Sequence, residues 1–556
     1  MTLVRSTSLL ALFLFTVQPV RPQGLAPERH LALRLEADSL YAAGERVEAA
    51  GLYAQIAGAH PADGQALSRA SRGRLEAGDL DAGLALYGEA AALGWGDAVA
   101  ERRIAAVLAG AGRRDEALDW IERALASGYE DRPDLAGDEA FAALADDPRF
   151  RRLAGLAPTD EPTREERWRR DLAHFLEEAR RLHAAPSGIA RSPEFAARVE
   201  ELQARVGTLT DIAVANELQR IIASLGDGHS VLYPLSTETV EFPALPLQFW
   251  WFEEGLHVVG APDEHADLIG ARVEAIGGTP VAEVVRALDP VVSRDNPQSF
   301  RWIVAAVLRF TPYLVELGYA DRPDRVILTV QDPGGAPRDV TVEAAPIHEL
   351  RTKLPAPPGI DPLPRWLRRI EDGYWLDPIP EMDALYVQIN QMRDIEDGES
   401  LEDFAQRARA ALVESGAHEL ILDLRHNNGG DNFTIWPIVR LVGWHEMEGG
   451  RTWAIVSRNT FSAAQDLVNF LDRTTATHFV GEESGSKPIF VGEDTGVVLP
   501  YSGLMMSISA RYWQDSYPGD ERIWIPVEMP VSETAEAYFA GRDAVLEALG
   551  RFLSSP

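Results

Sequence analysis

A glycine recurs every 34 residues near the start of the chain, at Gly44, Gly78 and Gly112. Each glycine opens a similar segment, in which a turn leads into a run of helix-forming residues. Five positions after each of them stands an alanine or another glycine, and such small residues let neighbouring helices approach closely. A period of this length is typical of stacked helix pairs, so residues 28–155 are predicted to form a helical repeat array.

The period resembles that of tetratricopeptide repeats, and Pro61 falls where the first unit should end. An alanine-rich helical array of another type is the alternative. Arrays of either kind usually bind a partner or dock onto a neighbouring domain. We therefore expect a protein partner for residues 28–155, and interaction rather than chemistry from this part of the chain.

Length and composition indicate a globular protein of several domains. The chain has 556 residues, of which 46% are hydrophobic and 25% charged, and single hydrophobic cores seldom exceed about 250–300 residues. The formal net charge of −33 argues against nucleic acid as a partner, because direct binding to it usually needs a basic face. Since the sequence contains no cysteine, disulfides, thiolate metal sites and cysteine catalysis are excluded.

The first residues have the layout of a secretory signal. Arg5 precedes a short apolar stretch, Leu9–Val17, which is too short to span a bilayer. Residues 1–23 are therefore predicted to be a signal peptide that exports the protein to the periplasm or the extracellular space. No later segment is long and apolar enough to be a stable membrane span.

Three further regions follow the repeats. Residues 164–233 show a helical pattern, and residues 236–348 contain short strands between turns. In residues 375–548, apolar strands alternate with helices, which predicts a layered α/β core. Strands are expected at 384–389, 420–424, 452–456 and 478–481, and helices near 400–415, 432–443 and 462–473.

Ser462 and Lys487 are candidates for a catalytic pair. Ser462 lies in a small-residue turn that opens an apolar helical run, and Lys487 is one of only two lysines in the chain. Arginine stays charged in a protein, whereas a buried lysine can become a neutral base. A hydroxyl beside a deprotonatable amine is one way to build a nucleophile, so hydrolysis through an acyl-enzyme is the leading hypothesis.

Two glycines follow a predicted buried strand, in the segment that runs from Asp423 through Gly429 and Gly430 to Asp431. Paired glycines permit backbone conformations closed to other residues and can leave N–H groups free to face a ligand. The N–H of Ala463, at the start of the helix that follows Ser462, could join them. Backbone N–H groups that converge beside a serine form an oxyanion hole.

These segments resemble the C-terminal processing (tail-specific) serine proteases, and more closely their tricorn-like and retinoid-binding-protein-like relatives. The resemblance covers roughly residues 165–548 and rests mainly on Asp423–Gly430, Thr460–Ala464 and the Gly481-Glu482 turn. It implies a crotonase-type (ClpP-related) α/β core in residues 375–548 and a PDZ-like domain in residues 236–348. The strand–turn–helix pattern of Ile276–Val284 also looks PDZ-like.

The resemblance also implies roles for particular residues. Ser462 would be the nucleophile of a serine endopeptidase, and Gly429, Gly430 and Ala463 would form the oxyanion hole. The substrate would be a peptide or protein, and the reaction needs no metal or organic cofactor.

The general base stays open between two residues. In one branch of the family the base is a lysine, at the position of Lys487. In the other branch it is a histidine, which would be His229, supported by a later carboxylate such as Asp520 or Glu528. A lysine base needs its pKa lowered by several units, whereas a histidine needs less adjustment.

Two other classes of function are the alternatives to a peptidase. The chain could be an inactive protein on the same scaffold that binds a peptide or a lipophilic ligand, or an interaction scaffold that acts through its repeats.

Overall fold

Two units of the chain fold around separate hydrophobic clusters. The computed structural model describes residues 25–129, 131–156, 162–346, 355–396 and 398–555, and the predicted signal peptide lies outside them. The first unit comprises residues 1–159 and the second residues 160–556. Each buried cluster draws its members from one unit only.

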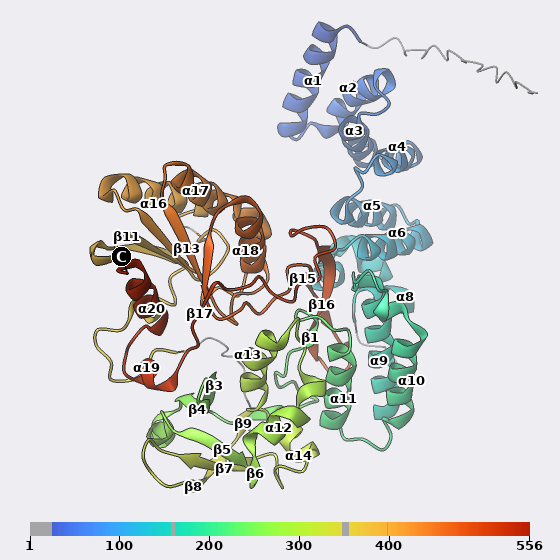
Figure 1. Cartoon of the computed structure of the whole chain (residues 1–556). Helices are drawn as coiled ribbons and strands as arrows, with labels where there is room; N and C mark the ends of the chain where they lie inside the picture. Colours follow the sequence, from blue (N-terminus) through green and yellow to red (C-terminus); the bar gives the residue numbers. More distant parts are fainter. Residues whose placement is uncertain (1–24, 130, 157–161, 347–354, 397, 556) are drawn as a thin grey trace, which may run out of the picture. The chain divides into compact units, whose positions relative to one another are not determined.

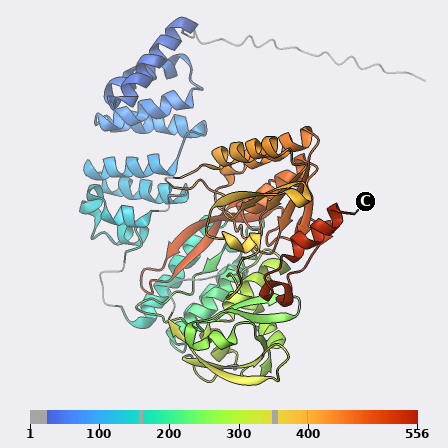
Figure 2. The same cartoon turned by 90° about the vertical axis from the view of Figure 1, so that its left-hand side faces the viewer.

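The first unit begins with three helix pairs, as the 34-residue period predicts, and Figure 2 shows its blue helices stacked. Gly44, Gly78 and Gly112 each stand in the turn within a pair, with positive φ angles of 89°, 79° and 76°. The small residue at Gly83 is required by packing, since a Cβ there would lie 2.6 Å from the Leu75 side chain. The helices are α1 (Pro27–Ala42), α2 (Arg46–Ala59), α3 (Gly64–Glu76), α4 (Leu80–Ala92), α5 (Ala98–Gly110), α6 (Arg114–Ala126), α7 (Arg132–Gly137) and α8 (Pro148–Leu153).

The second unit opens with three helices, α9 (Arg164–Leu182), α10 (Pro193–Arg205) and α11 (Asp211–Ala223). A side chain caps the start of each: Thr163, Ser192 and Thr210 accept hydrogen bonds from backbone N–H groups of the first turn. The chain then passes through Asp227–Ser230 into a short strand, β1 (Val231–Leu232). The helical pattern predicted for residues 164–233 is thus confirmed up to Ala223.

An antiparallel sheet occupies the middle of the unit, in the order β3-β4-β5-β7-β8. After β5 the chain turns through Gly277 and Gly278 into β6 and helix α12, which is the strand–turn–helix predicted from the sequence. The elements are β2 (Pro243–Ala244), β3 (Gln248–Phe252), β4 (Gly255–Gly260), β5 (Arg272–Ile276), β6 (Thr279–Pro280), α12 (Val281–Ala287), α13 (Pro297–Val307), α14 (Thr311–Glu316), β7 (Arg325–Gln331), β8 (Arg338–Glu343) and β9 (Ala345–Pro346).

The second sheet of the unit has the order β10-β11-β12-β13-β14-β17, parallel except for β10. Helices α16, α17 and α18 pack on one face and α20 on the other (Figure 1). The alternation predicted from the sequence is confirmed. The elements are α15 (Arg365–Arg368), β10 (Tyr374–Ile379), β11 (Ala384–Ile389), α16 (Leu401–Ser415), β12 (Glu419–Asp423), α17 (Trp436–Met447), β13 (Arg451–Val456), α18 (Ala463–Thr474), β14 (His478–Gly481), β17 (Met529–Pro530), α19 (Ala535–Phe539) and α20 (Ala544–Leu553).

A long hairpin, β15 (Phe490–Val498) and β16 (Met505–Trp513), was not expected from the sequence pattern. Strand β16 also pairs with β1, which brings the segment around His229 to the hairpin. The pairing with β16 is interrupted only at Glu493, which has a positive φ of 63°, and the register is the same on both sides of it. The hairpin therefore connects the helical start of the unit to the loops that follow β14.

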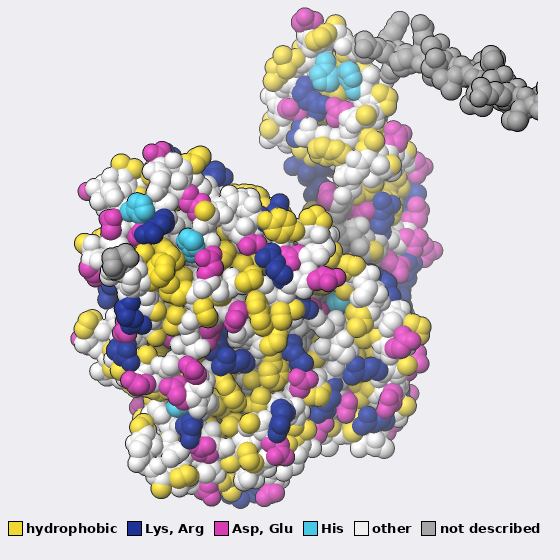
Figure 3. Space-filling model, viewed as in Figure 1, with side chains coloured by type: hydrophobic (Ala, Val, Ile, Leu, Met, Phe, Trp, Pro, Cys, Tyr) yellow, Lys and Arg dark blue, Asp and Glu magenta, His cyan; other side chains and the backbone are white. Residues whose placement is uncertain are grey.

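The surface drawn in Figure 3 mixes charges of both signs. Arg and Lys side chains lie among Asp and Glu, with no continuous basic area on this face. Among the described helices, none combines the length and apolar character needed to cross a bilayer.

Candidate active site

Ser462 stands at the N-cap of α18 with φ 55° and ψ −126°. A positive φ is strained for a residue with a Cβ, and such strain persists only where the surrounding structure imposes it. The backbone N–H of Ser462 donates to the Oγ of Ser486, at 3.2 Å. Strain of this kind at a strand-to-helix turn is how other hydrolases present a serine hydroxyl to substrate.

Gly429 packs directly against this serine. A Cβ at Gly429 would lie 2.7 Å from the Cβ of Ser462 and 3.2 Å from the N of Ala463, and the φ of Gly429 is 112°. Gly430, with φ 144°, lies against Met392, where a Cβ would come within 2.1 Å of the carbonyl oxygen. The structure thus places Gly429, the first glycine of the predicted pair, beside Ser462.

Two backbone donors are left without a partner beside Ser462. The N–H of Gly429 donates to Oδ1 of Asn427, at 3.0 Å. The N–H groups of Gly430 and Ala463, in contrast, make no hydrogen bond with any described group. Of the three N–H groups predicted to form an oxyanion hole, these two are therefore available to a ligand.

His229 packs against Phe461, the residue before the serine. Its ring is stacked between Phe461 and Phe490, with centroids 4.4 Å and 5.5 Å away. The side chain is only 6% exposed, and neither ring nitrogen has a hydrogen-bond partner among the described residues. A buried imidazole without partners is costly unless something else occupies its nitrogens when the protein acts.

Asp227, two residues earlier, is fully engaged. Its Oδ1 accepts hydrogen bonds from the N–H groups of His229 and Ser230 and from the hydroxyl of Ser509. Its Oδ2 lies 3.0 Å from Nε2 of His183. Although burial alone would raise it, these contacts, above all that with His183, hold the pKa of Asp227 below its ordinary value.

Lys487 is half-buried and has no hydrogen bond or ion pair with another residue that the structure describes. It directly follows Ser486, whose hydroxyl accepts the N–H of Ser462. The two acidic residues before it are occupied elsewhere. Glu482 forms a buried ion pair with Arg458, and Glu483 accepts a hydrogen bond from Gln298.

The two later carboxylates proposed to support His229 both bind other groups. Asp520 accepts hydrogen bonds from Arg522 and from Ser516, and the contact with Arg522 is the main reason that its pKa falls to about 2. Glu528 binds Nδ1 of His478, at 2.6 Å. The structure therefore does not bring either carboxylate to the imidazole of His229.

The carboxylate that the structure places next to the His229 loop is Asp295, which no sequence motif singled out. Its Oδ1 accepts the N–H of Gly228 at 2.8 Å, and its Oδ2 is buried without a partner in the described residues. Burial raises the pKa of Asp295, and the nearby imidazole of His229 opposes that shift. The only local signal is an N-terminal helix turn, Asp295-Asn296-Pro297, at the start of α13.

The neighbouring Asn296 fastens this turn to the serine loop. Its Oδ1 caps α13, accepting from the N–H groups of Gln298 and Ser299. Its Nδ2 lies 2.9, 3.2 and 2.8 Å from the carbonyl oxygens of Ser484, Ser486 and Ile523. One buried amide thus joins α13 to the segment that binds the backbone of Ser462.

A buried charge cluster lies at the end of β12. Arg425 donates to Asp423, Asp543 and Glu533, at 2.6, 2.8 and 3.3 Å, and all four are at most 8% exposed. One guanidinium cannot balance three carboxylates in a low-dielectric interior. Burial accordingly raises the pKa of Glu533 to about 7.

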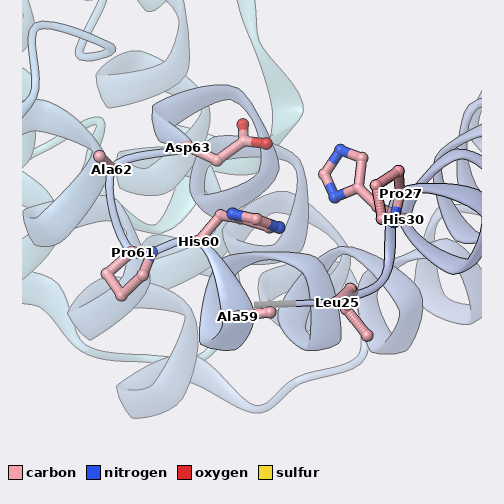
Figure 4. A pocket seen from close by; sticks show the side chains of 8 residues that line it. All are labelled: Leu25, Pro27, His30, Ala59, His60, Pro61, Ala62 and Asp63. Carbon is pink, nitrogen blue, oxygen red and sulfur yellow. The ribbon is translucent and has the colours of Figure 1, made fainter. Parts of the chain in front are cut away.

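Pockets occur in both units of the structure. One of about 440 Å³ is lined by three arginines, Arg198, Arg220 and Arg294, and reaches Asp295. Another of about 700 Å³ lies in the first unit (Figure 4), where the ring centroids of His30 and His60 are 4.7 Å apart.

No group of three or more His, Asp or Glu side chains in the described ranges is arranged to hold a metal ion.

No family model matches the sequence, and no curated protein sequence matches it. Among solved structures, mature CPAF complexed with lactacystin is similar with a TM-score of 0.51 at 12% identity, covering 70% of this chain and 98% of that chain. Mature CPAF is similar with a TM-score of 0.50 at 13% identity, and the match covers 70% of this chain and 96% of that chain. A photosystem II D1 C-terminal processing protease is similar with a TM-score of 0.36 at 15% identity, and the match covers 71% of this chain and 98% of that chain.

The two CPAF structures show that this chain shares their fold over about 70% of its length. The protease fold expected from the sequence resemblance is supported at that level.

Proposed function

We propose that the protein is a serine endopeptidase that cleaves peptide bonds through an acyl-enzyme on Ser462. The observation that carries the proposal is the strained N-cap conformation of Ser462, with φ 55°, held against Gly429. A protein has no structural need for strain at an ordinary helix cap, since serine caps helices in relaxed geometry. The proposed role of Ser462 as the nucleophile explains why the protein keeps this strained conformation.

The oxyanion is held by the N–H groups of Gly430 and Ala463. Both lack a partner among the described groups, and the N-terminus of α18 adds its partial positive charge. Ala463 directly follows the serine, and Gly430 directly follows Gly429, which packs against the serine. In the first step the hydroxyl oxygen of Ser462 attacks the carbonyl carbon, and the oxygen of that carbonyl takes the negative charge. Such donors are worth roughly 3 kcal/mol each in comparable enzymes.

His229 is the general base in this proposal. It is buried against Phe461, next to the serine, and its two ring nitrogens are unoccupied by described groups. It takes the hydroxyl proton of Ser462 and passes it to the leaving amine, which leaves an ester on the serine. Water then attacks the ester with the same base, releasing the acid and restoring the hydroxyl.

The substrate is an extended peptide or protein with apolar side chains. Large apolar side chains remain exposed after the glycine pair, since Phe433 is 72% and Trp436 42% exposed. Exposed aromatic side chains close to a reactive group are a common means of binding peptide.

The other regions would serve recognition and location. The sheet of residues 236–348 would act as a PDZ-like domain that reads peptide ends. The helix pairs of residues 28–155 would act as tetratricopeptide-like repeats that hold a protein partner. Export would place the protein in the periplasm or outside the cell.

A fluorophosphonate probe tests the nucleophile. We expect the full chain to be labelled and to cleave a casein-type substrate, and Ser462→Ala to lose both. Ser415→Ala, which changes an exposed serine near the end of α16, should keep both. A folded wild type that neither labels nor cleaves would overturn the proposal and leave a binding protein.

The two candidate bases are separated by a parallel pair of variants. His229→Ala should lower kcat by about 100-fold or more, because it removes proton transfer. Lys487→Ala should retain most of the activity. The opposite result would identify the lysine as the base.

A further inference from the structure

We propose that Asp295 is the carboxylate that positions the imidazole of His229. The inference rests on the proposed peptidase function. Asp295 acts as a positioning residue: it accepts a hydrogen bond from one ring nitrogen and so directs the other toward the hydroxyl of Ser462. It stays ionised while the imidazole carries the proton, so no proton is transferred to it.

The first argument is that two unsatisfied groups lie together. Oδ2 of Asp295 and both ring nitrogens of His229 are buried, and none of the three has a partner in the described part of the chain. The side chains of both residues are 6% exposed. Buried polar atoms in native proteins almost always find a partner, so neighbouring unsatisfied groups of opposite character point to a contact that forms during function.

The second argument is how the two residues are linked. Oδ1 of Asp295 binds the N–H of Gly228, the residue directly before His229, at 2.8 Å. Gly228 allows this close approach because it has no side chain. A Cβ there would lie 2.9 Å from the ring of Phe461 and 3.2 Å from Oδ1 of Asp295. The carboxylate is thus fixed to the histidine loop by one oxygen and presents its other oxygen unbound.

The third argument is that the turn carrying Asp295 is hydrogen-bonded to the segment that contacts Ser462. Asn296 binds the carbonyl oxygens of Ser484 and Ser486, and the hydroxyl of Ser486 accepts the N–H of Ser462. The Asp295-Asn296 turn therefore binds the residue next to His229 and the segment that accepts the N–H of Ser462. A positioning carboxylate needs this kind of rigid support, because small displacements cost large factors in rate.

Rival carboxylates are excluded by their contacts. Asp227 has no oxygen to spare, since it already binds three donors at Oδ1 and His183 at Oδ2. Asp494 acts electrostatically on His229 from strand β15, but it is exposed. Lys487 is the remaining charged group that acts on Asp295.

In the structure the imidazole is clamped between Phe461 and Phe490 and does not yet bind Asp295. Catalytic hydrogen bonds often tighten only when substrate is present. The proposal requires the ring to reorient within the aromatic clamp, so that a ring nitrogen meets the free oxygen of Asp295.

The test uses the full chain with three variants. Asp295→Asn keeps the size of the side chain and an oxygen for the N–H of Gly228, but removes the charge. Asp295→Glu keeps the charge, and Asp494→Asn is the matched control at another carboxylate that acts electrostatically on His229. We expect Asp295→Asn to lower kcat at least about 100-fold with KM little changed. Asp295→Glu should recover part of that loss, and Asp494→Asn should stay within about 3-fold of wild type.

A second readout does not depend on activity. In protein labelled with ¹⁵N-histidine, and with an irreversible phosphonate adduct on Ser462, the ring ¹⁵N shifts of His229 report which nitrogen carries the proton. His229→Gln identifies the signal. We expect one fixed form in wild type and Asp494→Asn, and a different form or a mixture in Asp295→Asn.

The outcomes separate the two proposals. If wild type neither turns over peptide nor forms the adduct, the peptidase function fails. The ring shifts of the free protein then still decide whether Asp295 affects His229. If Asp295→Asn is folded and matches wild type in both kcat and ring shifts, or if Asp494→Asn produces the losses instead, the assignment to Asp295 is wrong.

Discussion

At the scale of single residues, the site depends on what is missing as much as on what is present. Gly429 has no side chain, and the space where one would stand is taken by Ser462 and the N of Ala463. Its φ of 112° is also closed to residues with a Cβ. The glycine therefore sets how closely the loop after β12 approaches Ser462.

Gly429→Ala should push that loop away from the serine. A methyl group 2.7 Å from the Cβ of Ser462 must displace one of the two segments. Displacements near 1 Å at a reacting group cost roughly 100-fold. We expect kcat on a peptide substrate to fall by about that factor while the protein stays folded.

Gly416→Ala is the matched control for that substitution. Gly416 ends α16 with φ 65°, and a Cβ there meets nothing within 4 Å. It should cost about 1–2 kcal/mol of stability, from backbone strain alone. Equal loss of kcat in the two variants would show that strain, and not contact with Ser462, accounts for the effect.

Residue motifs pointed to one half of the proposed site and not to the other. The glycine pair and the Ser462 turn are each recognisable from a short segment of sequence, and the structure brings Gly429 against Ser462. Asp295 and Asn296 belong to no motif, because their role follows from the position of α13 in the folded unit. The choice of Asp520 and Glu528 failed for the same reason, since their partners are fixed by tertiary structure.

At the scale of elements, helix α13 is hydrogen-bonded at its start to the segment that contacts Ser462. Its N-cap residue Asn296 uses its oxygen for the helix and its nitrogen for three carbonyl oxygens of the serine segment. Helix and loop are therefore fixed by the same side chain. Loss of the nitrogen alone should loosen the loop and leave the helix capped.

Asn296→Asp tests whether the side-chain oxygen caps the helix while the nitrogen fixes the loop. Aspartate is an equally good cap, but its second oxygen would face carbonyl oxygens of Ser484, Ser486 and Ile523. Loss of three hydrogen bonds should cost about 3 kcal/mol. We expect a lower midpoint in urea unfolding and slower labelling of Ser462.

The control is an ordinary cap elsewhere. Ser400 accepts the N–H of Asp403 at the start of α16. Ser400→Ala should cost about 1 kcal/mol and leave labelling unchanged. If Asn296→Asp labels as fast as Ser400→Ala, the amide does not orient the serine loop.

Elements with a clear period were predictable, and interrupted ones were not. Strands β11 to β14 are short apolar runs between helices, and their positions were expected to within one residue. Strand β15 contains Gly492, Glu493 and Asp494, which break the apolar alternation where the pairing with β16 is interrupted. The hairpin is set by pairing with β16 and β1, which no local pattern reveals.

At the scale of the whole molecule, stability should depend on the buried cluster around Arg425. Glu533 has a pKa of about 7 in the folded protein against an ordinary value of 4.5. The folded state therefore binds this proton more tightly than the unfolded state. It follows that the free energy of unfolding falls as pH rises from about 4.5 to about 7, by roughly 3 kcal/mol from this group.

Glu533→Gln should remove that dependence. Glutamine resembles the neutral acid, so the variant should match wild type near pH 4.5 and be more stable above pH 7. Urea unfolding at both pH values measures the difference. Glu536→Gln, at a largely exposed carboxylate, should leave the wild-type slope intact. The same slope in wild type and Glu533→Gln would contradict the expectation.

The Asn296 contacts also govern when the protein can become active. They join residues separated by 188, 190 and 227 positions along the chain. Contacts between such distant residues form late, because a long stretch of chain must first be ordered. We therefore expect a chain still being synthesised, or one that has partly unfolded, to hold no aligned nucleophile. For the proposed peptidase, this order of folding would limit self-digestion.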